Sequence, residues 1–299
     1  MRVTNSMMMK STLRDVGQNL ARLQDTQNKL SSGKQIGRPS DDPSGTTSAM
    51  SIRRELRQFD RQSSSLVDAQ GWVGTADAQL TSGLDQLVRA KDLVVRAGNG
   101  ATQMTPSARA ALATELRSVS SDLLSIANSN YAGRPVFAGT AAGVPYDLTG
   151  AYAGNDDAVV RDVDQNTSMT VNVTGSQVFG TFDATGTGTG NMFQVLDRLA
   201  TAIQNGDNAA MATEHANLDA AADTMRAAAA LVGSRSSSLE QLKSRLDDRK
   251  ITLQSNLSQV EDVDVVEALV RAKAQETTYQ ASVQTAAKIL PVSLLDYLH

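Results

Sequence analysis

Hydrophobic and polar positions follow a heptad period near the start of the chain. Apolar or small-contact side chains recur there at alternating spacings of four and three residues. They are Met9, Leu13, Val16, Leu20, Leu23, Gln27 and Leu30. Because a 3.5-residue repeat keeps one stripe facing a partner helix, the pattern predicts a coiled-coil seam. The flanks of the stripe are so polar that this helix needs a partner to be stable in water.

A dense run of helix-breaking residues interrupts the pattern at "GKQIGRPSDDPSG", residues 33–45. Gly33 can adopt a positive φ and end the first helix. Asp42 directly precedes Pro43, which is the arrangement of an N-cap followed by proline at the first helical position. The pattern therefore predicts a second helix from Pro43 to about Ala97.

The middle of the chain changes character. Thr105 before Pro106 repeats the cap signature and predicts a third helix. After Tyr131 the sequence becomes rich in Gly, Pro and aromatic residues, and β-branched side chains then alternate with polar ones. Because this alternation is typical of half-buried strands, a small β module is predicted over residues 140–190.

Helical periodicity resumes with "NMFQVLDRLATAIQNG" and an alanine-rich segment that runs to "LVGSR". From Ser236 to Ile289 the pattern predicts a very long helix, which Pro291 ends. Its first stripe is Leu239, Leu242, Leu246, Leu253, Leu257 and Val260, and its second is Val265, Leu269, Ala272, Tyr279, Val283, Ala286 and Leu290. Because Asp262 and Asp264 stand where a new helix would be capped, we expect two rods with a joint between them.

These patterns predict a mainly α fold: a long coiled-coil or helical rod built from both chain ends, with a small inserted β domain. Residues 1–35 with 264–299 are expected to form a terminal coiled-coil domain. Residues 36–139 with 191–263 are expected to form a helical rod domain, and residues 140–190 an outward-facing β domain.

Composition narrows the possible functions. The 299 residues carry a formal net charge of −4, which argues against a general nucleic-acid or membrane-surface binder. The basic excess in residues 1–61 is spread along an amphipathic helix, and we interpret it as one of two complementary faces in an assembly. There are no cysteines, so disulfides and zinc–thiolate sites are excluded. No stretch has the roughly 20 apolar residues of a membrane span, and the first residues do not resemble a secretory signal.

No catalytic, cofactor-binding or metal site is predicted. His215 and His299 are the only histidines, too few for a triad or a multi-histidine metal site. The glycine run "TGTGTGN", residues 185–191, lacks the spacing and the lysine of a phosphate loop. "DVDQNTS", residues 162–168, echoes a calcium loop but lacks its glycine and closing glutamate, so we interpret it as a turn between strands.

The aspartate pair in the first interruption has two possible roles. Asp41 and Asp42 could act as an acid and a base, but no nucleophile, metal ligand or apolar pocket is apparent beside them in the sequence. Capping is the stronger interpretation, with Asp41 and Arg38 closing the loop. The predicted hinge loop and cap comprise Arg38, Pro39, Asp41, Asp42 and Pro43.

Four segments together resemble a known family. "LQDTQNKLSSGKQIGRPSDDPSG" at 23–45 is similar to the N-terminal signature of the axial proteins of the bacterial flagellum. Within that flagellin superfamily, "RPSDDP" at 38–43, "GRPVFAGT" at 133–140 and "AAKILPVSLLDYL" at 286–298 resemble hook–filament junction proteins. The likeness covers roughly the two ends of the chain and leaves the β module unidentified.

The resemblance implies a structural protein, not an enzyme, that joins hook to filament and templates flagellin assembly. In this family the terminal helices pair as the inner tube, the next helices form a rod, and the β module faces outward. The implied partners are further copies of the chain, the first hook-associated protein on the hook side, flagellin on the filament side and an export chaperone. No cofactor, nucleic acid or membrane is implied. Export through the flagellum's own secretion channel would place the protein outside the cell.

The heptad stripes supply the candidate assembly residues. Stripes that bury only partly against each other leave apolar surface for neighbours related by a non-closing screw operation. The expected interface is Leu13, Val16, Leu20, Leu23, Leu30, Leu269, Ala272, Tyr279, Val283, Leu290, Leu294 and Leu295. In the isolated subunit we expect these polar-rich helices to be disordered. The alternatives are flagellin itself and, from another class, a cytoplasmic coiled-coil scaffold.

Overall fold

The computed structural model describes four stretches of backbone: residues 5–100, 104–164, 167–184 and 190–295. Side chains are described in the same stretches except at 5–6, 99–100 and 289–295. The chain divides into two compact units, Met1–Phe59 with Asp248–His299 and Asp60–Asp247. We refer to them as unit 1 and unit 2.

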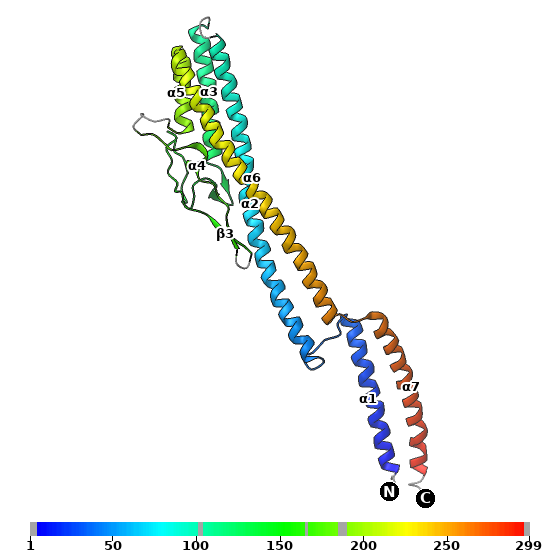
Figure 1. Cartoon of the computed structure of the whole chain (residues 1–299). Helices are drawn as coiled ribbons and strands as arrows, with labels where there is room; N and C mark the ends of the chain where they lie inside the picture. Colours follow the sequence, from blue (N-terminus) through cyan, green and yellow to red (C-terminus); the bar gives the residue numbers. More distant parts are fainter. Residues whose placement is uncertain (1–4, 101–103, 165–166, 185–189, 296–299) are drawn as a thin grey trace. The chain divides into compact units, whose positions relative to one another are not determined.

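Unit 1 contains a pair of antiparallel helices from opposite ends of the chain. Helix α1 spans Asn5–Ser32 and helix α7 spans Val265–Leu295, and the two lie side by side (Figure 1). The start of α2 (Pro43–Gly100) and the end of α6 (Asn208–Glu261) complete the unit. The interruption predicted at 33–45 separates α1 from α2, which begins at Pro43, and the joint predicted near Asp262 and Asp264 separates α6 from α7.

The prediction that Pro291 ends the last helix is wrong, because α7 continues to Leu295. Proline lacks the N–H that would bond to the carbonyl four residues earlier, and its ring strains the preceding turn. This loss removes one hydrogen bond, while the backbone on both sides of the proline stays helical. The helix therefore passes the proline.

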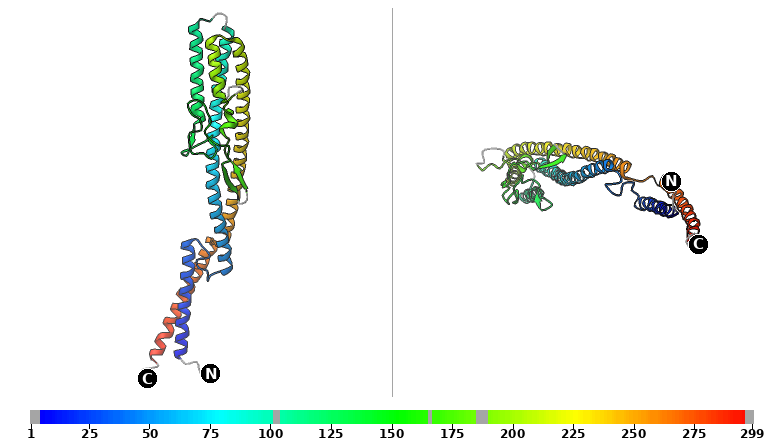
Figure 2. Two further views of the ribbon diagram at one scale, coloured as in Figure 1. Left: turned by 90° about the vertical axis from the view of Figure 1, so that its left-hand side faces the viewer. Right: turned by 90° about the horizontal axis from the view of Figure 1, so that it is seen from below.

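Unit 2 is organised around a helical bundle of α2, α3 (Pro106–Ala127), α5 (Met192–Asn205) and α6 (Figure 2). The buried side of α2 keeps the heptad period, and α2 continues past the predicted end to Gly100. Its buried residues include Leu66, Ala69, Val73, Ala76, Leu80, Leu87, Ala90, Val94 and Ala97. The predicted cap of α3 is confirmed, since the Ala108 amide donates to Thr105 Oγ1 at 3.3 Å and Pro106 is the first helical residue.

Helix α6 is a single continuous helix, so the predicted start of a long helix near Ser236 is wrong. Its buried stripe continues at seven-residue spacing through the "LVGSR" segment, by way of Met225, Val232, Leu239, Leu246 and Leu253. A Cβ at Gly233 would meet no other atom, so no packing constraint interrupts the helix there. The periodic burial outweighs the low helix propensity of one glycine. The long element does end at Glu261, as the predicted joint requires.

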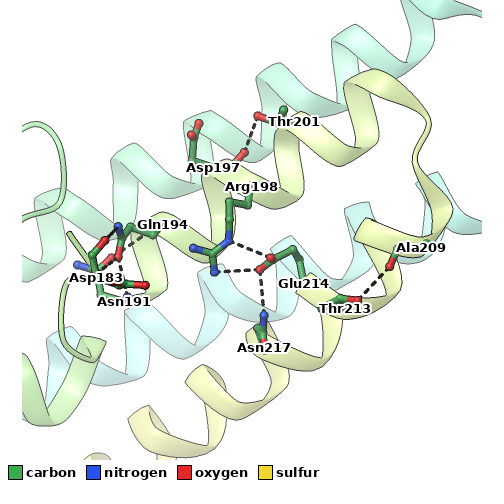
Figure 3. A network of polar contacts seen from close by, with 10 residues as sticks. All are labelled: Asp183, Asn191, Gln194, Asp197, Arg198, Thr201, Ala209, Thr213, Glu214 and Asn217. Carbon is green, nitrogen blue, oxygen red and sulfur yellow. Dashed lines mark hydrogen bonds and ion pairs between the residues drawn. The ribbon is translucent and has the colours of Figure 1, made fainter. Parts of the chain in front are cut away.

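A polar network fixes the hairpin between α5 and α6 (Figure 3). Arg198 of α5 bonds Glu214 of α6 in a two-pronged ion pair, with Nε–Oε1 at 2.9 Å and Nη2–Oε2 at 3.1 Å. Gly206, at φ 71°, closes α5 in the left-handed conformation that glycine adopts without strain. At the start of α5, Asn191 and Gln194 form a reciprocal capping box.

The β module has less regular strand than the alternation predicted, and its first strand pair lies before residue 140. It contains two antiparallel pairs: β1 (Asn130–Tyr131) with β2 (Arg134–Pro135), and β3 (Val160–Asp164) with β4 (Thr167–Thr170). Residues Gly175–Phe179, predicted within the alternating β segment, form the short helix α4 instead. The backbone N–H of Thr174 donates to Gln177 Oε1 at 3.3 Å. Residues 165–166 of the predicted turn, and 185–189 of the glycine run, lie outside the described residues.

Aromatic side chains form the core of the β module. The rings of Phe137, Tyr146, Tyr152, Phe179 and Phe193 contact one another with centroids 5.1–5.6 Å apart. Their mostly tilted and edge-on arrangements suit the quadrupoles of aromatic rings. A module with little regular strand is thus held by one compact cluster. Phe193 belongs to α5, which ties the module to the bundle of unit 2.

Candidate assembly surface on the terminal helices

The seam between α1 and α7 is built mostly from small and polar side chains. The residues of α1 that lose exposure recur every three or four positions: Met9, Thr12, Val16, Asn19, Leu23, Thr26 and Leu30. Those of α7 are Ala268, Ala272, Gln275, Tyr279, Ser282 and Ala286. Such a seam lets two helices approach closely but buries little apolar area. It contributes correspondingly little hydrophobic stabilisation.

The predicted interface residues divide into three groups. Val16, Leu23, Leu30, Ala272 and Tyr279 face the seam and are buried or half-buried. Leu13, Leu20, Leu269 and Val283 are exposed, at 53%, 36%, 62% and 41% of their full accessibility. Leu290, Leu294 and Leu295 lie outside the residues whose side chains are described.

The exposed leucines miss the seam by one residue. Leu13 and Leu20 follow the inward-facing Thr12 and Asn19, and one residue turns the side chain by about 100° around a helix of 3.6 residues per turn. The sequence pattern missed Ala268 and five polar seam positions: Thr12, Asn19, Thr26, Gln275 and Ser282. Their only sequence signal is a second three–four spacing, displaced by one residue from the apolar one.

Four of the exposed apolar residues, two from each helix, lie on the same side of the pair. Leu269 and Val283 each follow an inward-facing residue of α7 by one position, as Leu13 and Leu20 do on α1. In an antiparallel pair the same offset points to the same side. A groove of about 660 Å³ opens on this side, and its lining includes Leu23, Leu269, Val270, Ala272 and Tyr279. We call Leu13, Leu20, Leu269, Val270 and Val283 the apolar flank.

The opposite side of the pair is charged. A second groove, of about 530 Å³, is lined by Arg22, Asp25, Lys29, Glu267 and Arg271 together with smaller polar residues. Two ion pairs lie there within single helices: Lys29 with Asp25 at 3.2 Å and Arg271 with Glu267 at 2.6 Å. We call these five residues the charged flank. The groove on the apolar side is also lined by Lys273 and Glu276, which pair at 2.8 Å, but this side carries more exposed apolar surface than the other, so the helix pair is amphipathic.

Covering the apolar flank would release substantial free energy. Full burial of a Leu or Val side chain is worth about 1.5–3 kcal/mol, so a half-exposed one retains about 1 kcal/mol each. The buried polar groups of the seam do not add comparable stabilisation. Thr26 satisfies its hydroxyl within α1 by donating to the Arg22 carbonyl at 3.1 Å.

The hinge loop is held by its two aspartates. Asp42 Oδ1 accepts from the amides of Ser44 at 3.0 Å and Gly45 at 2.9 Å, which caps α2 at Pro43. These hydrogen bonds, with one from the Ser44 hydroxyl, lower the pKa of the Asp42 carboxyl. A Cβ at position 45 would meet the Asp42 carboxylate and the Ile36 side chain, so a larger residue there would displace the cap.

The second aspartate orders the loop itself. Asp41 Oδ2 accepts from the amides of Gly37 at 3.1 Å and Arg38 at 2.8 Å. Arg38 and Pro39 line a small cavity of about 330 Å³ near Met50 of α2. Neither aspartate faces a second titratable group in a pocket, so the geometry suits capping and not acid–base chemistry.

The remaining candidate chemistry also has structural explanations. His215 Nε2 lies 3.8 Å from Asp219, which pairs with Lys91 between α6 and α2. Within the described residues, no three His, Cys, Asp or Glu side chains gather as metal ligands. None of the described helices is both long and apolar enough to cross a membrane.

Comparison with known proteins identifies relatives of both chain ends. Residues 3–142 match the family model described as the bacterial flagellin N-terminal helical region. Residues 215–298 match the one described as the bacterial flagellin C-terminal helical region. The two matches together include both helices of the terminal pair.

Curated relatives extend the similarity along the chain. Flagellar hook-associated protein 3 of Salmonella typhimurium is 27% identical over 314 residues, covering 98% of each chain. A flagellin of Bacillus subtilis is 26% identical over 174 residues, covering 58% of this chain and 56% of its own. A solved structure of a putative flagellar hook-associated protein from Vibrio parahaemolyticus shares the fold, with a TM-score of 0.65 and 20% identity. That match covers 74% of this chain and 100% of the Vibrio chain.

Proposed function

Because this chain belongs to the flagellin family, we propose that it is the structural subunit that joins hook to filament in a bacterial flagellum. The similarity to flagellar hook-associated protein 3 runs along 98% of both chains, whereas the similarity to Bacillus subtilis flagellin covers 58% of this one. Since the β module lies between the two family regions, agreement along the whole length favours the junction subunit over flagellin.

The observation that carries this proposal is the amphipathic terminal pair. The apolar flank retains about 1 kcal/mol per exposed side chain, which only a further surface can recover. A copy of the same chain displaced by a screw operation offers the same flank at every step, and such an operation generates a tube when it does not close. The charged flank remains available to water in that arrangement.

In this assembly each part of the chain would have its own structural role. Residues 1–35 with 264–299 would form the inner tube, and residues 36–139 with 191–263 the surrounding rod. The β module of residues 140–190 would face outward. The hinge loop at 36–42 would lead the chain from the inner-tube helix into the rod, with Asp42 capping the rod helix.

The expected partners are those of a junction. Copies of this chain would contact the first hook-associated protein on the hook side and flagellin on the filament side. A dedicated chaperone would hold the chain before export through the flagellar secretion channel. The protein would then act outside the cell, in the flagellum, as a structural element and not as an enzyme.

Deletion of the gene tests this proposal. We expect cells that keep intact hooks, lose their filaments and release flagellin into the medium. Cells that retain filaments of normal length would overturn the proposal. Flagellin is the second candidate, and purified subunits that grow into long filaments without other proteins would favour it instead.

A further inference from the structure

Two short segments of unit 1 run antiparallel to each other where α1 ends and α7 begins. Gly33–Gln35 follows α1, and Glu261–Val263 precedes α7. The segments are joined by two backbone hydrogen bonds: the Val263 amide donates to the Gly33 carbonyl at 3.0 Å, and the Gln35 amide donates to the Glu261 carbonyl at 2.6 Å. Lys34 and Asp262 form an antiparallel bridge between them. We call this pairing the clasp.

A buried carboxylate holds the clasp to the neighbouring helix. The side chain of Glu261 is only 6% exposed. Its Oε2 accepts from Arg53 Nη2 of α2 at 2.6 Å and from Lys34 Nζ of the clasp at 3.3 Å. Because a buried carboxylate is costly unless it is paired, and here two cations share it, the arrangement strongly favours one geometry.

The clasp lies directly against the ends of both terminal helices. Gly33, with φ 70°, follows the last residue of α1. Asp264 follows the clasp and caps α7, since its Oδ1 accepts from the amides of Val266 at 2.9 Å and Glu267 at 3.1 Å. With no flexible linker on either side, the clasp determines how far α1 and α7 are displaced along each other.

The seam itself does little to specify this displacement. Threonine, asparagine and threonine recur at seven-residue spacing on α1, opposite the similarly spaced Ala268, Gln275 and Ser282 on α7. A slip of one heptad would place similar small or polar residues opposite one another. Coiled coils with well-defined register rely on distinctive core positions, which this polar layer lacks, and the large side chains of the seam, such as Leu23 and Tyr279, are few. A further feature that fixes the register would therefore add to what the seam specifies.

We propose that the clasp, through Glu261, Lys34 and Arg53, is a register lock for the terminal helix pair. It selects one axial alignment of α1 against α7 and so determines which side chains stand beside each other on the apolar flank. The lock is a property of the single chain. Only its use in building a uniform tube rests on the function proposed above.

Disulfide cross-linking in the full-length protein measures the register directly, because the chain has no native cysteine. Thr26 and Ala268 line the same groove, so Thr26→Cys with Ala268→Cys reports the observed alignment. Asn19→Cys with Ala268→Cys reports an alignment slipped by one heptad. With Glu261 intact we expect the first pair to form its disulfide at least about tenfold faster than the second, as a difference in effective concentration.

Glu261→Gln keeps the shape of the side chain and removes its charge. We expect this change to bring the two cross-linking rates to within about twofold of each other, since the charge-assisted hydrogen bonds to both cations are weakened. Glu267→Gln is the matched control: it removes an exposed carboxylate whose ion pair, within the described residues, is with Arg271 of the same helix, and it should preserve the tenfold preference.

A second variant separates loss of register from loss of folding. Lys34→Gln with Arg53→Gln removes both cations and should reduce the preference in the same way. Emission from Trp72, the single tryptophan and a buried residue of unit 2, reports whether unit 2 stays folded. An unchanged preference in Glu261→Gln, or equal rates with Glu261 intact, would overturn the lock. Either result would leave the gene-deletion test of the junction function unaffected.

Discussion

The two helical seams of this protein differ in which side chains they bury. In unit 2, α2 turns its large apolar residues inward, and Leu66, Leu80 and Leu87 are at most 1% exposed. In unit 1, α7 turns alanines inward and leaves Leu269 and Val270 more than 60% exposed. Both seams keep the heptad period. Unit 2 therefore completes its core within one chain, whereas the terminal pair leaves its largest apolar surface uncovered.

This difference indicates that the exposed apolar surface of the terminal pair can still gain free energy when another surface covers it. Hydrophobic stabilisation grows with the apolar area removed from water, so a seam of alanine and polar residues is weak and an exposed leucine represents unused stabilisation. Exposed apolar surface on a protein commonly marks an interaction site. The same helical period thus serves self-contained folding in one unit and, as we propose, association in the other.

The largest expected effect is on assembly and comes from the apolar flank. Leu13→Ser with Leu269→Ser should abolish filament restoration in cells that lack the gene, because it removes apolar area that only a neighbour covers. The isolated variant should unfold within about 0.5 kcal/mol of the parent, since both side chains are exposed. Filaments are counted by electron microscopy.

The matched control lies on the charged flank. Arg22→Ser with Arg271→Ser changes two exposed residues that line the groove of the charged flank and should leave most filaments in place. Equal loss of filaments in the two variants would remove the distinction between the flanks.

The second prediction concerns order in the isolated subunit. Because its seam is weak, the terminal pair should open far more often than unit 2. Limited proteolysis should cleave within α1 and α7 at least about a hundredfold faster than within the buried part of α2. Mass spectrometry of the fragments locates the cuts. Terminal helices as resistant as unit 2 would contradict this expectation.

The third prediction measures the completed core. Leu80→Ala removes a fully buried side chain from α2 and should lower the free energy of unfolding of unit 2 by about 2–5 kcal/mol. Val88→Ala, at an exposed position of the same helix, should cost less than about 0.5 kcal/mol. Denaturant unfolding followed by Trp72 fluorescence reports both. Similar losses would mean that the α2 seam is not the core of unit 2.

The fourth prediction compares two tyrosines of the β module. Tyr152 donates to the carbonyls of Phe137 at 3.0 Å and Asn155 at 2.9 Å, so Tyr152→Phe should destabilise unit 2 by about 1 kcal/mol. The buried hydroxyl of Tyr146 has no hydrogen-bond partner among the described residues, so Tyr146→Phe should be neutral or stabilising by about 1 kcal/mol. The reverse order of the two effects would refute this assignment.

The pH dependence of stability provides a further test of the role of Tyr152. Burial raises the pKa of Tyr152 to about 12. The unfolded chain therefore loses this proton first, above about pH 10, and the parent protein becomes less stable as the pH rises toward the folded pKa. Tyr152→Phe cannot lose this proton, and its unfolding curve should fall less steeply across that window.

The smallest expected effect is at the hinge. Asp42→Ala removes the cap of α2 and should lower the melting temperature by a few degrees at most, with Asp41→Asn as the milder control. Since hydrogen bonds lower the pKa of folded Asp42, its contribution is present above the unfolded pKa of about 4 and is lost as the pH falls through the folded pKa. Melting curves that are identical at neutral pH would exclude the cap.

Local signals predicted the helix starts that depend on a side-chain cap. The cap before Pro106 and the joint before Val265 both follow from short-range hydrogen bonding by Thr105 and Asp264, which does not depend on distant packing. Asp262 was predicted to share the capping role. Its side chain instead accepts a hydrogen bond from Ser258. Its backbone forms a β-bridge with Lys34, a residue more than two hundred positions away.

It was harder to predict which side of each helix packs against a partner. The apolar stripe of α1 looked like one seam, but Val16 faces α7 while Leu20 does not. The pattern shows that a stripe exists and does not show which of its edges meets a partner within the chain. Glu261 gave no sequence signal at all, since its two cations come from separate segments of the chain.

The sequence by itself determined the helical period, the capped helix starts, and the family to which both ends belong, because these depend on neighbouring residues and short motifs. Only the tertiary structure decided that α1 and α7 meet mostly through small and polar residues, that Leu13, Leu20, Leu269 and Val283 share one exposed side, and that a buried glutamate joins three segments. The reason is physical: burial is a property of pairs of surfaces, and a single helix carries several faces that could serve equally well until a partner covers one of them.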